Sequence, residues 1–164
     1  VIGDGASWIW KSANRALTGC HQTLDIYHAC EHIADAGKRL FGEGTADAMA
    51  FFEKGRTLLL AEGWKGVCDL VGEQYQRNLT QTEREICEGL TRYFMANTKR
   101  LDYAGNLKKG LAIGSGVVEG AAKTLGLRLK ARGARWNLKN ARAMAGMICI
   151  RQGPEWTAYW SSVA

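Results

Sequence analysis

Three acidic residues occur in sequence contexts that suit a catalytic carboxylate. Asp4 lies between two glycines directly after an apolar pair, so its side chain would project from a strand end with little crowding. Asp25 lies between two apolar residues, where a charge is costly unless it faces a partner or solvent. Glu119 follows the Gly-Ser-Gly run at 114–116 and falls in the first turn of a predicted helix. The ordinary alternatives are that Asp4 is a turn aspartate and that Glu119 only interacts favourably with the dipole at the start of its helix.

Two of the three histidines form a second candidate site. His28 and His32 are four residues apart in a predicted helix, and Asp25 precedes His28 by three residues, so all three could line one face. Imidazoles at this spacing can hold Zn²⁺. However, the order His-Ala-Cys-Glu-His differs from the His-Glu-x-x-His of zinc metalloproteases, and no third strong ligand follows at a usual spacing. Histidines hydrogen-bonded in a packing face of the helix are the ordinary alternative.

Composition limits the class of protein. The 164 residues are enough for one domain with a sizeable core, and 46% hydrophobic with 23% charged residues excludes wholesale disorder. No apolar run reaches the roughly 18 residues of a membrane span, so we expect no membrane partner. The five cysteines are odd in number and never form a Cys-x-x-Cys pair. They indicate reduced thiols in a cytoplasmic protein rather than a secreted disulfide scaffold.

The net charge of +6 is unevenly distributed along the chain. Residues 1–97 hold 10 basic and 13 acidic side chains, whereas residues 98–164 hold 12 basic and 3 acidic ones. Between Glu119 and Glu155 there is no acidic residue, and the basic residues there are Lys123, Arg128, Lys130, Arg132, Arg135, Lys139, Arg142 and Arg151. Such a block either contacts several phosphates or is a solvated face, and its length favours nucleic acid.

The elements that would position these residues are mostly helical. A single proline permits long helices, and the apolar spacing has the helical period along most of the chain. We predict a strand at 23–26, a break at 42–45, and a loop at 101–116, where four glycines occur. We predict helices over 6–17, 28–41, 45–62, 67–77 and 138–151. Three further helices are predicted: one capped by Thr80 or Thr82, one from Ser115 to Gly133, and a short final one with Pro154 in its first turn. In the helix after Ser115, the predicted buried face is Val118, Ala122, Leu125 and Leu129.

Several segments together resemble one family. The run Gly3-Asp4-Gly5-Ala6 before Trp8-Ile9-Trp10, and the run Asp25-Ile26-Tyr27-His28-Ala29-Cys30-Glu31-His32, resemble the catalytic region of bacterial insertion-sequence transposases of the DDE type. The similarity is to the ISKra group, distantly related to the Mutator-like transposases. The segment 110–120, followed by Arg128-Leu129-Lys130 and Gly133-Ala134-Arg135-Trp136, resembles the part that supplies the final glutamate of that family. The segments occur in family order and span nearly the whole chain.

This resemblance implies an RNase H-like core in which three carboxylates bind two Mg²⁺ ions, for which Mn²⁺ can substitute. By analogy Asp4 is the second carboxylate and Glu119 the third, and both are metal ligands. Asp25 and His28 match the Asp-x-x-His motif that supports the site. The first aspartate is expected upstream of Val1, because the chain resembles a piece of a longer protein cut inside a fold. An assignment of Asp4, Asp25 and Glu119 as the complete trio stays open.

The resemblance also implies a division of the chain. Residues 1–41 would be a segment of the core, 42–109 an α-helical insertion, and 110–164 the helix with the glutamate followed by basic helices. The expected fold is mostly α with a small β remnant, that is, a partial RNase H-like core carrying a helical insertion.

The implied reaction is Mg²⁺-dependent cleavage and strand transfer of DNA. The partners would be transposon ends and target DNA, with a homo-oligomer as the active complex. Lys123, one turn after Glu119, would meet a phosphate near the metals. Arg128, Lys130, Arg132 and Arg135 would follow the DNA backbone, which positions the duplex without reading bases. Trp136 would stack on an unpaired base or, alternatively, fill a core position.

Two other classes of function are compatible with the same residues. A helical nucleic-acid-binding module without catalysis would use the same basic C-terminal third. A zinc hydrolase would be built on His28 and His32. Divalent-metal binding at Asp4 and Glu119 separates the first alternative from a transposase, and the zinc content of the purified protein tests the second.

Overall fold

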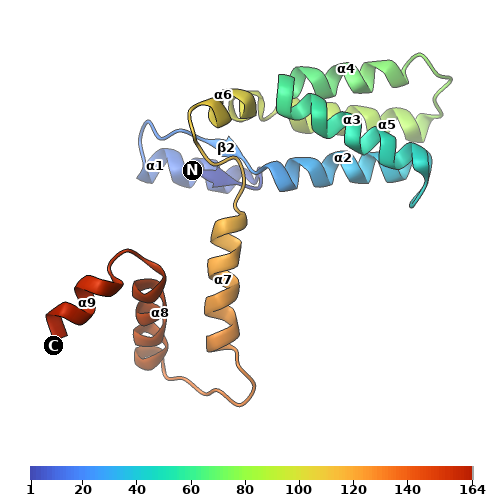
Figure 1. Ribbon diagram of the computed structural model, residues 1–164. Coiled ribbons are helices and arrows are strands. Elements are labelled where there is room, and N and C mark those ends of the chain that lie inside the picture. Colours follow the sequence, from blue (N-terminus) through green and yellow to red (C-terminus); the bar gives the residue numbers. More distant parts are fainter. Residues whose placement is uncertain (164) are drawn as a thin grey trace. The chain divides into compact units, whose positions relative to one another are not determined.

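The computed structural model describes residues 1–163 and divides the chain into two units, Val1–Ser115 and Gly116–Ala164 (Figure 1). The chain is mostly helical, as predicted, and its described residues include one short parallel strand pair. The elements of the first unit are β1 (Ile2–Gly3), α1 (Ser7–Ala16), β2 (Thr23–Leu24), α2 (Ile26–Phe41), α3 (Ala46–Glu62), α4 (Trp64–Gln74), α5 (Gln81–Met95), the 3₁₀ turn η1 (Thr98–Arg100) and α6 (Tyr103–Lys108). Those of the second unit are α7 (Gly116–Leu129), α8 (Leu138–Gln152) and α9 (Trp156–Val163).

The N-terminal part of the first unit is a strand–helix–strand crossover. β1 and β2 run parallel, with Ile2 opposite Thr23 and Gly3 opposite Leu24, and α1 connects them. The predicted strand at 23–26 is shorter in the structure because Asp25 leaves the ladder and becomes the N-cap of α2. Its side chain accepts a hydrogen bond from the backbone N–H of Tyr27, so α2 begins at Ile26, two residues before the predicted start.

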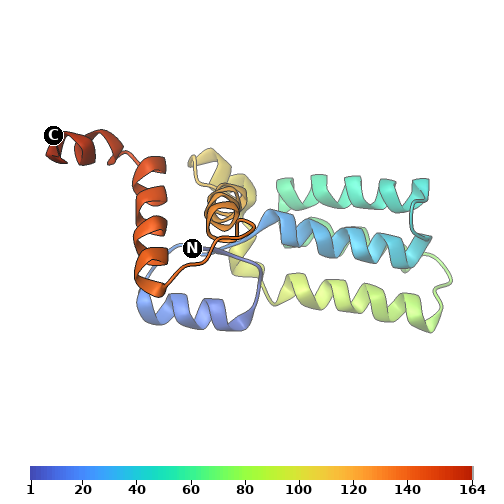
Figure 2. The ribbon, with the colours of Figure 1, turned by 90° about the horizontal axis from the view of Figure 1, so that it is seen from below.

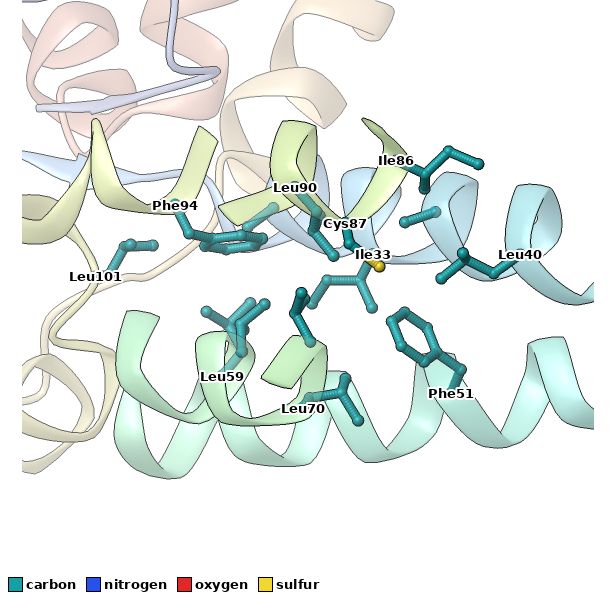
Figure 3. Packing of buried hydrophobic residues seen from close by; sticks show 14 of the residues in the cluster. Ile33, Leu40, Phe51, Leu59, Leu70, Ile86, Cys87, Leu90, Phe94 and Leu101 are labelled. Carbon is teal, nitrogen blue, oxygen red and sulfur yellow. The ribbon is translucent and has the colours of Figure 1, made fainter. Parts of the chain in front are cut away.

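The core of the first unit lies among four helices. α2 lies between α3 and α5 (Figure 2), and α4 packs against both α3 and α5, so the four helices enclose one interior. Ile33 of α2, Leu59 of α3 and Phe94 of α5 are fully buried there (Figure 3). Burying an aliphatic or aromatic side chain of this size contributes about 1.5–3 kcal/mol. The predicted boundary at 41/42 therefore does not separate two units, because α2 shares its core with the helices that follow.

Local capping signals in the sequence set several helix ends. Thr45 accepts a hydrogen bond from the N–H of Ala48 and caps α3. Of the two threonines predicted to cap α5, Thr80 does so. It forms a capping box with Glu83, in which each side chain accepts from the other residue's backbone N–H. The Thr80 N–H and the Thr80 hydroxyl both donate to the Glu83 carboxylate, and these two hydrogen bonds lower its pKa.

The prediction of a loop over 101–116 is wrong in its first half. Residues 103–108 form α6, whose N-cap Asp102 accepts a hydrogen bond from the N–H of Gly105 at 2.9 Å. Gly105 within this short helix and Gly110 just after it made the segment look like a loop in the sequence. Its position depends on tertiary contacts, because Tyr103 and Asn106 are buried against the strands. The remaining residues up to Ser115 are irregular, as predicted.

The described residues of the second unit form three helices and enclose no buried interior. Among residues 116–162, for which side-chain exposure is described, no residue is buried. The predicted buried face of α7 is therefore wrong: Val118 is 69% exposed, Ala122 is exposed, and Leu125 and Leu129 are half-buried. α9 begins at Trp156, so Pro154 precedes that helix rather than occupying its first turn. None of the helices within residues 1–163 is both long and apolar enough to cross a membrane.

Candidate functional site

The carboxyl ends of β1 and β2 carry the two aspartates that were predicted as site residues. Asp4 directly follows β1, and Asp25 directly follows β2. Because the two strands are parallel, both residues lie at the same edge of the strand pair. In open parallel sheets this edge is where ligands bind. The structure therefore brings Asp4 and Asp25 to one edge of the first unit.

Asp4 presents its carboxylate to solvent. The side chain is exposed, and its Oδ1 accepts a hydrogen bond from the N–H of Ala6 at 2.9 Å. The next residue, Gly5, has a φ of 98°, a conformation that side chains disfavour. A Cβ atom at Gly5 would also lie 3.2 Å from Leu24 and 3.3 Å from the hydroxyl of Tyr93. The glycine thus permits the tight turn that leaves Asp4 uncrowded.

Asp25 is placed very differently, with only 1% of its surface exposed. Its Oδ1 accepts the hydrogen bond from Tyr27 at 2.8 Å. Its Oδ2 accepts one from the backbone N–H of Ser115 at 3.0 Å and another from the Ser115 hydroxyl. A buried carboxylate needs such donors to offset its lost hydration. Both carboxylate oxygens of Asp25 thus accept hydrogen bonds from donors of the protein.

The segment before α7 lies against the start of α2. Besides the two Ser115 contacts, the N–H of Ile26 donates to the carbonyl oxygen of Ile113 at 3.0 Å. At Gly114 a Cβ atom would lie 2.9 Å from the ring of Tyr27, so a side chain there would force this ring to shift. In the sequence Ser115 marks only the start of a predicted helix, and its contact with Asp25 was not predicted.

Tyr93 of α5 is a further residue at this edge, and the sequence alone did not identify it as a candidate site residue. Its hydroxyl donates a hydrogen bond to the carbonyl oxygen of Asp4 at 3.5 Å. Its ring stacks on His32 of α2 with a centroid distance of 3.7 Å. Burial, reinforced by the nearby Asp4 carboxylate, raises the pKa of Tyr93 to about 12. The phenol therefore keeps its proton at neutral pH and can donate to the Asp4 backbone.

The two histidines of α2 have separate neighbours. His28 is half-buried, and its Nδ1 hydrogen-bonds Glu31 Oε2 at 2.9 Å. His32 stacks on Tyr93, and partial burial lowers the pKa of its imidazole. Within residues 1–163, no group of three or more His, Cys, Asp or Glu side chains is arranged to hold a metal ion.

Helix α6 holds β2 in place from the other side. The Tyr103 hydroxyl donates to the carbonyl oxygen of Leu24 at 3.0 Å, and the side-chain amide of Asn106 donates to the Thr23 hydroxyl at 3.1 Å. Tyr103 is fully buried, and this burial raises its pKa. These contacts fix the end of β2, and with it the backbone that carries Asp25.

Glu119 lies in the first turn of α7, as predicted, four residues after Ser115. Asp4 belongs to the first unit and Glu119 to the second. Their sharing of a metal ion therefore stays a prediction. The chemistry of the two side chains suits it, since Mg²⁺ is usually bound through one or two carboxylates together with water.

The second unit carries the excess positive charge of the whole chain. Residues 1–115 hold 14 basic and 14 acidic side chains, whereas residues 116–164 hold eight basic and two acidic ones. The predicted DNA-binding cations are all exposed, namely Lys123, Arg128, Lys130, Arg132 and Arg135. A groove of about 470 Å³ among α7, α8 and α9 includes two arginines, Arg128 and Arg151, beside apolar side chains such as Met144 and Trp156. This composition suits a polyanion whose sugars and bases also offer apolar surface.

Trp136 is half-buried in the turn after α7. Its indole N–H donates to the carbonyl oxygen of Leu129 at 3.1 Å, near the C-terminus of that helix. The contact satisfies a carbonyl that a helix end otherwise leaves without an intrahelical partner. Trp136 therefore does not fill a buried core position, and its stacking on a base stays a prediction.

Comparison with known proteins gives no match: no family model, no curated protein and no solved structure is similar to this chain.

Proposed function

We propose that this chain is part of the catalytic region of a DDE transposase. The observation that carries the proposal is the parallel strand pair with Asp4 and Asp25 at its carboxyl edge, joined through Ser115 to the segment that leads to Glu119. The segments with Asp4 and Asp25 pair as parallel strands, Asp25 hydrogen-bonds Ser115, and Ser115 directly precedes the helix that contains Glu119. An RNase H-like core is the fold that goes with this proposal.

The proposed metal ligands are Asp4 and Glu119, with Mg²⁺ as the ion and Mn²⁺ as a substitute. Asp4 fits because its carboxylate is exposed at the strand end and is braced by the N–H of Ala6. When bound, the ions would activate the attacking hydroxyl and stabilise charge on the attacking and leaving oxygens. The described residues would orient the carboxylates: Gly5 allows the turn at Asp4, and Tyr93 donates to its backbone.

The proposed substrate is DNA, held by the exposed cations Lys123, Arg128, Lys130, Arg132 and Arg135 of the second unit. Their side chains would neutralise backbone phosphates, while His28 and Asp25 support the site at the first unit. The proposal includes transposon ends and target as the two DNA partners, a homo-oligomer as the active complex, and the cytoplasm as the compartment. The five cysteines are free thiols, which suits a reducing compartment.

The experiment that tests this proposal is a Mn²⁺ titration of the full chain by calorimetry. Metal binding is the better readout than cleavage, because the resemblance puts a third ligand outside residues 1–164. We expect Asp4→Ala and Glu119→Ala each to weaken Mn²⁺ affinity by at least about tenfold, which is about 1.4 kcal/mol of binding free energy. Asp69→Ala and Glu88→Ala are matched controls, since both residues are exposed on helices α4 and α5. Equal affinities in all five proteins would contradict the proposal.

A non-catalytic nucleic-acid-binding module is the second candidate, and the charge separation between the units favours it specifically. All of the net positive charge resides in residues 116–164. A protein of this kind would bind DNA equally well with and without Mn²⁺, and Asp4→Ala would have no effect on either ligand. The titration above therefore distinguishes the two candidates.

A further inference from the structure

The groove among α7, α8 and α9 lies entirely within the second unit and has a volume of about 470 Å³. Its apolar part consists of three half-buried side chains of α8, namely Met144, Met147 and Ile148. Trp156 of α9 adds an aromatic ring that is 37% exposed. This ring is held by an edge contact with Trp160, at a centroid distance of 5.4 Å. The groove therefore offers an apolar surface to which an ordered indole contributes.

The charged side chains of this groove are of one sign. Arg128 lies in the last turn of α7 and Arg151 in the last turn of α8, and both are exposed. No acidic side chain is among the described residues that line the groove. The larger groove between α4 and α5, of about 760 Å³, differs, because it contains both Glu88 and Arg92, whose charges offset each other. The groove of the second unit is thus complementary to an anion that also carries apolar surface.

An unpaired nucleotide combines these two properties in one residue. In a duplex the faces of the bases are stacked inside, so a duplex would cover the arginines and leave the apolar part of the groove uncovered. A nucleotide of a single strand offers its phosphate to guanidinium groups and the face of its base to an aromatic ring. A volume of this size is also within the range of pockets that hold small ligands.

We propose that the groove among α7, α8 and α9 binds an unpaired nucleotide of single-stranded DNA. Its phosphates lie at Arg128 and Arg151, and its base packs on Trp156. The inference rests on the proposed function for the identity of the ligand as DNA, and it adds the form of DNA that this part of the second unit holds. It involves residues of the second unit alone.

The alternative is that the same side chains act only locally. Both arginines occupy the last turns of their helices, where a cation interacts favourably with the helix dipole. Trp156 would then do no more than pack on Trp160. A local role gives no reason for single-stranded and duplex DNA to respond differently to a substitution. The ratio of the two affinities therefore separates the alternatives.

The test measures fluorescence anisotropy of the full chain with labelled oligothymidylate and with a labelled duplex of equal length, at the same salt concentration. We expect Trp156→Leu to weaken oligothymidylate binding by about tenfold, because stacking of a base on an aromatic ring has this magnitude. Duplex affinity should stay within about twofold of the parent. Trp156→Phe keeps an aromatic face and should retain most of the affinity. Arg151→Gln should weaken binding of oligothymidylate more than binding of the duplex.

Two matched controls belong to the test. Trp8→Leu removes a tryptophan of α1 that is 67% exposed and far from the groove in the sequence, and it should leave both affinities unchanged. Arg142→Gln removes an exposed cation of α8 that does not line the groove. It should lower both affinities in equal proportion, because it removes charge without removing a groove contact.

Failure of this inference is distinguishable from failure of the proposed function. If Trp156→Leu and Arg151→Gln leave the ratio of the two affinities at the parent value, the groove is not a site for an unpaired nucleotide. Equal loss in Trp156→Leu and Trp156→Phe would refute the packing of a base on this ring. In both cases the transposase proposal stands as long as Asp4→Ala and Glu119→Ala weaken Mn²⁺ binding. If the ratio changes as expected but these two variants bind Mn²⁺ like the parent, the groove belongs to a non-catalytic module.

Discussion

Asp4 and Asp25 illustrate how neighbours decide what a carboxylate can do. Both follow a strand of the same parallel pair, yet Asp4 faces solvent, whereas Asp25 is buried and accepts three hydrogen bonds. An exposed carboxylate keeps its capacity for an external cation. A buried one whose oxygens already accept from protein donors instead holds those donors in place. The pKa of Tyr93 is sensitive to this environment, because its side chain is half-buried and lies beside Asp4.

At the residue scale we predict that Tyr93 titrates about two pH units above an ordinary tyrosine, whose pKa is about 10. Burial disfavours the phenolate, so the folded state holds the proton more tightly than the unfolded state does. The contribution of this burial to the stability of the folded state is therefore present below pH 10 and is lost as the pH rises through about 12. Ultraviolet titration of the parent and of Tyr93→Phe measures the step that this residue contributes.

The same titration has an internal control. Asp4→Asn removes a nearby negative charge and should lower the pKa of Tyr93, because the Asp4 carboxylate disfavours the phenolate. A Tyr93 step at the ordinary pKa in the parent protein would contradict the packing described for this edge of the strand pair.

At the scale of elements, the close approach of helices depends on a glycine. Gly55 of α3 is buried where α3 meets α2 and α4, and a Cβ atom there would lie 2.7 Å from Ile33 and 3.0 Å from Leu70. Ile33 is fully buried and Leu70 nearly so, which limits how far either can move. The interior of the four helices therefore has no room for an added methyl group at this position.

We predict opposite effects for two glycine-to-alanine substitutions in helices. Gly55→Ala should lower the free energy of unfolding by about 1–2 kcal/mol, because overpacking outweighs the gain in helix propensity. Gly89→Ala should raise it by about 0.5–1 kcal/mol, because Gly89 of α5 is exposed and a Cβ atom there meets no atom within 4 Å. Urea unfolding of both variants measures the difference, and a stabilised Gly55→Ala would refute the described packing of α2 against α3.

At the scale of the whole molecule, charge and core are separated between the two units. The first unit is electrically balanced and holds the buried core, whereas residues 116–162 include no buried side chain and belong to the unit with the excess of cations. Helices without a buried face gain little stability from packing. This separation of charge and core is compatible with the proposal that the second unit binds DNA.

We predict that DNA binding is strongly salt-dependent and depends on the second unit. Five exposed cations that displace counterions would reduce affinity by about 10²–10³ between roughly 50 and 200 mM salt. Arg128→Gln and Lys130→Gln should each reduce the slope of log affinity against log salt by about one. Lys65→Gln, an exposed cation of α4 in the first unit, is the matched control and should leave the slope unchanged. Fluorescence anisotropy at several salt concentrations measures these slopes, and a flat profile would exclude phosphate contacts.

Local chemistry in the sequence determined most of the helices and the candidate residues at their ends. The Thr80–Glu83 capping box, the Thr45 cap and the break at 42–45 each act within a few residues, so they could be recognised without a fold. The placement of Asp4 at a strand end and of Glu119 in a first helical turn follows from neighbours in the chain in the same way.

Tertiary structure alone decided the features that depend on distant residues. Helix α6 is short and contains a glycine, so the sequence did not reveal it, and Tyr103 and Asn106 hold it against β2. The burial of Asp25 and its contact with Ser115 join segments 90 residues apart, and no local pattern encodes such a pair. The physical reason is that capping depends on the nearest few residues, whereas burial of a carboxylate depends on which distant donors the fold brings to it.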